Sequence, residues 1–213
     1  MKAKEGRPYS SPLRVEQAAA TRERIVDAAV ELLQAGDAAA VSMQDVADRA
    51  GVAVRTVYRA FPTRDDLIEG VLVAIKERFE ASAGTPPATA EEFSSSIGAA
   101  VGAVFELEPL YRALFATQAG REAHRRSAGD RRAHVEAAFA DELASLTPAQ
   151  CRQVTAVMHL VTSSSGVLIL KDYGGLDKEA TQGAVSFAVA ALMAALRDPE
   201  LRAGIGHIQG DAP

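Results

Sequence analysis

The chain has 213 residues, enough for one large domain or two small ones, and its 48% hydrophobic and 24% charged residues are typical of a globular protein. Its net charge of −5 excludes a generally basic nucleic-acid-binding polymer, so any surface for nucleic acid must be local. The one cysteine, Cys151, excludes a disulfide framework and a cysteine-based zinc site.

The composition favours helices along the whole chain. Alanine is abundant, aromatic residues make up 5% of the chain and tryptophan is absent, whereas strands are usually rich in aromatic and β-branched residues. We therefore predict an all-α fold. It begins with a flexible basic arm over residues 1–12, because this segment has no apolar pattern.

The segment 13–64 is predicted to form a small domain of three helices. The helices cover about 13–34, 42–50 and 54–61. Ser42 is a good N-cap for the second helix, with Asp45 as the acidic residue of its first turn, and Gly51 ends it. The apolar residues expected to face inward are Ile25, Ala29, Leu32, Leu33, Met43, Val46, Ala47, Ala50, Val54, Val57 and Phe61.

A second helical domain is expected over residues 65–200. Thr63 caps a helix that extends to about residue 79, and the segment 82–89, with one glycine and two prolines, is the clearest linker. Further helices are predicted at about 90–107, 109–119, 121–146, 147–172 and 177–197, with a break in the third left open near Gly129. A loose tail is expected over 201–213, because this segment is rich in glycine.

The chain shows no pattern of a membrane protein. Its longest apolar stretch, 184–196, is shorter than the roughly 18 residues of a membrane span and contains Ser186. The N-terminus lacks the apolar segment of a signal peptide. We therefore expect a cytoplasmic protein without membrane contact.

The second and third helices fit a helix-turn-helix. This arrangement needs a small residue, a turn and an apolar contact between the helices, which Ala47, Gly51 and Val57 supply. The outer face of the third helix offers donors for phosphates and base edges. These donors are Arg55, Thr56, Tyr58 and Arg59. By themselves, two helices joined by a glycine are also compatible with plain helical packing.

A longer window resembles a known family. The matching segments are Thr21-Arg22, Ile25–Ala29, Leu32-Leu33, Ser42–Val52 and Thr56–Leu67. Together they closely resemble the TetR family of bacterial transcriptional regulators, whose members are all-helical homodimers with an N-terminal DNA-binding domain and a C-terminal domain that binds an effector.

The resemblance implies roles for seven residues at DNA. Ser42 and Gln44 would lie near DNA, Arg55, Thr56, Tyr58 and Arg59 on the recognition helix, and Arg64 at a phosphate. One position departs from the pattern: Ala60 stands where the family often has a His or Tyr that touches the DNA backbone. The methyl side chain of Ala60 has no polar group for that contact.

The second domain carries no motif that identifies an effector. We expect a small, largely apolar molecule between walls formed by Phe93, Phe105, Tyr111, Phe115, Met158, His159 and Thr162. Small residues of the last helix would allow close packing in a homodimer. These residues are Ala184, Ala188, Ala191 and Ala195.

Other polar groups favour structural roles. The basic stretch 121–132, with His124 and nearby His134, is typical of a solvated helix face, although it could hold an anionic effector or touch DNA. Cys151 and His159 lack the third ligand of a metal site. We expect no catalytic residue, metal or cofactor.

The sequence thus predicts a DNA-binding transcriptional repressor that a small molecule releases from double-stranded operator DNA, and no enzymatic activity. The alternative is a helical small-molecule-binding or enzymatic protein with a vestigial helix-turn-helix. Binding to the DNA upstream of its own gene distinguishes the two.

Overall fold

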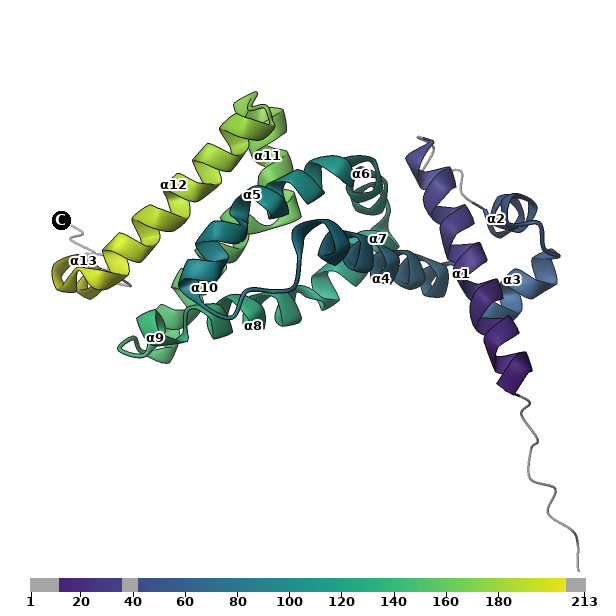
Figure 1. The fold of residues 1–213 in the computed structure, drawn as a ribbon, viewed down its shortest axis with the longest axis horizontal. Coiled ribbons are helices and arrows are strands. Elements are labelled where there is room, and N and C mark those ends of the chain that lie inside the picture. The colour runs from purple at the N-terminus through teal and green to yellow at the C-terminus, as the bar shows by residue number, and fades with distance from the viewer. Residues whose placement is uncertain (1–11, 36–41, 206–213) are drawn as a thin grey trace, which may run out of the picture. The chain divides into compact units, whose positions relative to one another are not determined.

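The computed structural model describes residues 12–35 and 42–205, which form thirteen α-helices and no β-strand (Figure 1). The predicted all-α fold is confirmed. Within the described residues, the helices form two compact units, one within Met1–Ala74 and Ala113–Arg121, the other within Ile75–Arg112 and Glu122–Pro213. The predicted arm, apart from Pro12, and the tail from residue 206 lie outside the described residues.

The first unit is built on three helices and part of a fourth. These are α1 (Pro12–Gln34), α2 (Met43–Ala50), α3 (Val54–Ala60) and the first half of α4 (Arg64–Ala83). α1 packs against both α2 and α3, and α2 packs against α3 (Figure 1). Their fully buried side chains include Ile25, Val30, Val46, Ala47, Val57, Phe61 and Val71. The three predicted helices of this domain are therefore present.

The turn between α2 and α3 depends on Gly51. Its φ of 64° lies in the left-handed region that favours glycine. The Gly51 N–H donates to Asp48 O (3.3 Å), and the Val52 N–H donates to Ala47 O (3.0 Å). This pair of bonds is a Schellman motif, which ends α2 and turns the chain directly into α3.

Reciprocal capping boxes begin α2 and α4. Ser42 Oγ accepts the Asp45 N–H (3.1 Å), and Asp45 Oδ2 accepts the Ser42 N–H (3.1 Å). Thr63 and Asp66 repeat this arrangement at α4. Hydrogen bonds from the Ser42 and Thr63 side chains and backbones lower the pKa of the two carboxyls. The predicted caps, Ser42 and Thr63, are confirmed.

The second unit contains the remaining helices. They are α5 (Ala90–Glu106), α6 (Glu108–Ala116), α7 (Gln118–Arg126), α8 (Ala128–Ala138), α9 (Ala140–Leu143), α10 (Pro148–Thr162), α11 (Ser164–Gly174), α12 (Lys178–Arg197) and α13 (Pro199–Ala203), with the end of α6 and the start of α7 belonging to the first unit. α12 packs against α5, α10 and α11, and α10 packs against α8 (Figure 1). Of the described helices, α12 alone is long and apolar enough to cross a membrane, a property that core helices share.

The prediction of one helix over 147–172 is wrong. The chain bends by 59° between α10 and α11. At the bend, Ser163 Oγ accepts the Gly166 N–H (3.0 Å) and donates to Leu160 O (3.0 Å). A Cβ at Gly166 would lie 1.9 Å from Leu160 O, so the close approach of the two helices requires glycine there.

The same motif separates α6 from α7, so the helix predicted over 109–119 ends three residues early. Thr117 Oγ1 accepts the Gly120 N–H (2.9 Å) and donates to Leu114 O (3.1 Å). A Cβ at Gly120 would lie 2.1 Å from that oxygen. The helix predicted over 121–146 is likewise divided, with breaks at Ser127 and Phe139.

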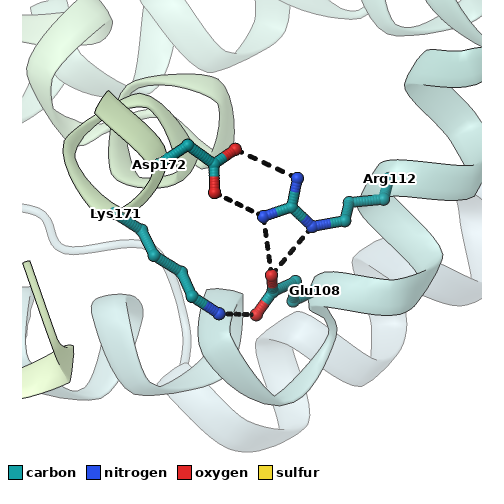
Figure 2. A network of polar contacts seen from close by, with 4 residues as sticks. All are labelled: Glu108, Arg112, Lys171 and Asp172. Atoms are coloured by element: carbon teal, nitrogen blue, oxygen red, sulfur yellow. Dashed lines mark hydrogen bonds and ion pairs between the residues drawn. The ribbon is translucent and has the colours of Figure 1, made fainter. Parts of the chain in front are cut away.

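A network of four charged side chains joins α6 to α11 (Figure 2). Arg112 binds both carboxylate oxygens of Asp172 (2.6 and 3.0 Å), and Glu108 accepts from Arg112 and Lys171. Burial alone would raise the pKa of Glu108, but the hydrogen bonds from Lys171 and Arg112 lower it overall. Two positive and two negative charges therefore balance in this network.

Candidate nucleic-acid interface

The outer face of α3 carries the candidate contacts to nucleic acid. Arg55, Tyr58 and Arg59 are exposed, with 51% of Tyr58 accessible, whereas Val57 on the opposite side is completely buried. Spacings of three and four residues put the exposed side chains on one helix face. Thr56 is half-buried at its edge. No acidic residue occurs in α3, so its donors face outward without a carboxylate from their own helix.

The two candidate residues at the start of α2 already have partners within the chain. Ser42 Oγ caps the helix and donates to Asp45 Oδ2 (2.6 Å). Gln44 Nε2 donates to Asp48 Oδ1 (2.8 Å) on the exposed side of α2. The second N–H and the carbonyl oxygen of the Gln44 amide can contact DNA while this bond is kept.

Arg22 has a structural role that no local sequence pattern indicates. Its Nη1 donates to Ala60 O (2.6 Å), and its guanidinium lies 3.9 Å from the centroid of the Phe61 ring. Thus α1 holds the end of α3, just before α4 begins. Arg64, the predicted phosphate contact, is exposed at the first residue of α4.

The predicted effector-binding residues are spread over both units. Phe115 belongs to the first unit, and the other six belong to the second. Phe93 packs edge-on against Phe139, with ring centroids 5.1 Å apart, and Lys171 lies 5.1 Å from the Phe105 ring. Met158 is completely buried, and Tyr111 is 7% exposed. His159 and Thr162 are half-buried.

Comparison with known proteins matches the N-terminal part of the chain to a family. Residues 25–71 match the model of the bacterial regulatory proteins of the tetR family. A curated relative, the HTH-type transcriptional repressor KstR of Rhodococcus jostii (strain RHA1), is 42% identical over 66 residues, which cover 31% of each chain. The match thus spans less than a third of that relative.

Solved structures share the fold over most of the chain. A tetR-family transcriptional regulator from Streptomyces coelicolor has a TM-score of 0.63 and 21% identity, covering 85% of this chain and 88% of its own. The multidrug binding protein EbrR, complexed with imidazole, has a TM-score of 0.55 and 23% identity, covering 80% and 93%. At these identities the likeness is one of fold.

Fold and site together define an all-α protein with an N-terminal helix-turn-helix domain. The resemblance to the TetR family is confirmed, and the N-terminal domain belongs to that family.

Proposed function

We propose that this protein is a transcriptional repressor that binds operator DNA through its first unit and leaves it when a small molecule binds. The observation that carries the proposal is the exposed, acid-free face of α3, held by Val57 and Gly51 in a domain of the tetR family. Arg55 and Arg59 would donate to base edges and phosphates in the major groove. The repressor function of the relative KstR supports the direction of regulation.

The working form would be a homodimer. One short recognition helix makes too few contacts for tight binding, so two half-sites about 34–36 Å apart are needed. An exposed apolar face of α12 supports self-association. Phe187 lies on it with 76% of its surface accessible, beside the exposed small residues Ala180, Gly183, Ala190, Ala191 and Ala194.

The effector would act through α4. This helix is continuous from Arg64 to Ala83, and the boundary between the two units falls between Ala74 and Ile75, inside it. A small, largely apolar molecule that favours one orientation of α4 would change the distance between the two recognition helices of a dimer. By linkage, operator DNA would weaken binding of that molecule by the same factor.

A gel-shift experiment with the DNA upstream of the protein's own gene tests the proposal. We expect a shifted band for the wild type that unrelated DNA does not compete away at equal concentration. The alternative, an enzymatic or ligand-binding protein of the cytoplasm whose helix-turn-helix is vestigial, predicts no preference between the two DNAs. Equal competition by both would therefore reject the repressor function.

A further inference from the structure

Four helices of the second unit bring together a polar cluster that the DNA-binding function does not use. It contains Tyr111 of α6, His124 of α7, Arg131 of α8 and His159 of α10, and the charge of Arg131 acts on each of the other three side chains. We name these four residues the Arg131 cluster. Arg131 Nη2 lies 3.2 Å from His124 Nε2. The Tyr111 hydroxyl shares a hydrogen bond with Ser164, at the start of α11.

Arg131 brings a half-buried positive charge into this cluster without a matching carboxylate. Its guanidinium donates to His124 O (2.8 Å) and to Ser127 Oγ. Among residues 12–35 and 42–205, Arg131 forms no ion pair. Asp130, the residue before it, attracts its charge but is itself exposed to solvent. The Arg131 Nε–H is buried and meets no acceptor among these residues. An unpaired charge and an unpaired donor are both costly inside a protein.

In the charged network on α6 and α11, in the same unit, each cation is paired with a carboxylate. There, the half-buried Lys171 and the more exposed Arg112 have Glu108 and Asp172 as partners (Figure 2). The Arg131 cluster has no such partner of its own, so its charge balance calls for an anion from outside the chain.

The two imidazoles add no charge to the cluster, so Arg131 carries its positive charge, while the exposed Arg132 acts on His159 from the surface. Burial, followed by the nearby Arg131, lowers the pKa of both His124 and His159, so both rings are neutral at pH 7. Burial raises the pKa of Tyr111 to about 12, which keeps its hydroxyl protonated and able to donate. One positive charge matches a monoanion such as a carboxylate better than a dianionic phosphate.

A purely structural role explains part of this geometry. By donating to His124 O, Arg131 satisfies a carbonyl in the last turn of α7, where a cation also interacts favourably with the helix dipole. That role uses Nη2 but leaves Nε–H without an acceptor. It also does not explain why Tyr111 and His159, which come from two other helices, lie near Arg131.

We propose that the small molecule carries a carboxylate on its apolar body and that Arg131 binds this group through Nε–H. The inference rests on the proposed release by an effector and gives that effector a charge. Tyr111 and the neutral imidazoles supply further hydrogen bonds.

Calorimetric titration of the full chain with straight-chain acids from hexanoate to decanoate, and with the corresponding primary amides, tests the proposal. We expect the best acid to bind about 10- to 100-fold more tightly than its amide, since a hydrogen bond to a charged group is stronger than one to a neutral group. Arg131→Met should abolish this preference. Arg132→Met is the matched control, because Arg132 is exposed and pairs with Glu136 on the surface of α8.

Equal affinity for acid and amide, no binding of any acid to the folded protein, or an unchanged preference in Arg131→Met would each overturn the proposal. If Arg131 serves only to cap α7, Arg131→Met lowers the melting temperature and leaves the preference in place. Arg131→Lys provides a second variant that keeps the charge and should keep part of the preference. The ligand-free wild type should shift operator DNA, so a failure of the wild type to bind DNA counts against the repressor function and not against the anion site.

Discussion

At the scale of single residues, neighbouring positions of α3 have different roles, one in packing and one in the proposed contact with DNA. Val57 is completely buried and holds the helix, whereas Arg55 is exposed on the opposite face. We expect Arg55→Ala to weaken operator binding by about 1–3 kcal/mol and to relax sequence preference at one position, without loss of helicity. Competition gel shifts with single-base variants of the operator measure this effect. Arg125→Ala, which removes an exposed arginine of α7, is the control with the same loss of charge.

His124 makes stability depend on pH in a defined window. Burial, then the charges of Arg131 and His159, lower its pKa from 6.5 to about 4. Between these values the unfolded chain binds more protons than the folded one, so the free energy of unfolding falls as the pH falls through this window and is unaffected above it. His124→Gln should therefore flatten the decline in melting temperature between pH 6.5 and 4.5.

The exposed His134 supplies the control for that measurement, because His134→Gln should keep the wild-type slope. A decline as steep in His124→Gln as in the wild type would contradict the assignment of this window to His124.

At the scale of elements, the helix break at Ser163 depends on one missing side chain. Gly166→Ala places a Cβ 1.9 Å from a backbone oxygen, so we expect a loss of about 1–3 kcal/mol in the free energy of unfolding as α10 and α11 move apart. Gly102→Ala lies inside α5 with nothing within 4 Å, and should stabilise the protein by up to about 1 kcal/mol. Urea unfolding of both variants checks the contrast, and equal effects would refute the steric explanation.

Elements with strong local signals could be predicted from the sequence. The capping residues Ser42 and Thr63, the turn at Gly51 and the inward face of α3 all follow from rules that span four residues or fewer. The break at Ser163 was missed because apolar periodicity continues across it. A Ser or Thr followed three residues later by Gly also occurs at the Thr117 break, but the same spacing at Ser95 lies inside the continuous α5, so the spacing alone does not predict a break.

Contacts between distant segments had no such signal. Arg22 and Ala60 are 38 residues apart, and Arg112 and Asp172 are 60 apart, so neither pair can be recognised from spacing. The Arg131 cluster is a similar case. Its stretch resembles a solvated helix face in sequence, and only the folded chain shows that Arg131 turns inward while the adjacent Arg132 remains exposed.

At the scale of the whole molecule, Phe187 tests the proposed dimer. A large aromatic side chain with 76% of its surface accessible is a good candidate for an interface anchor. Phe187→Glu should weaken self-association by about 2 kcal/mol or more, which sedimentation equilibrium measures at micromolar concentration. Leu201→Glu on α13, also an exposed apolar residue, is the control that should leave the dimer intact. A wild-type protein that sediments only as a monomer would reject the dimer itself.

The path of the chain between its two units also limits how evolution or an engineer can recombine it. The chain crosses the boundary three times, after Ala74, after Arg112 and after Arg121, because the segment Ala113–Arg121 returns to the first unit. A hybrid joined at a single point to the second unit of another protein would thus carry a foreign segment in its first unit. Exchanging specificity without disturbing that unit requires two grafts, one for each of its segments, with Leu114 and Gly120 kept from the same parent because they meet at the α6–α7 break.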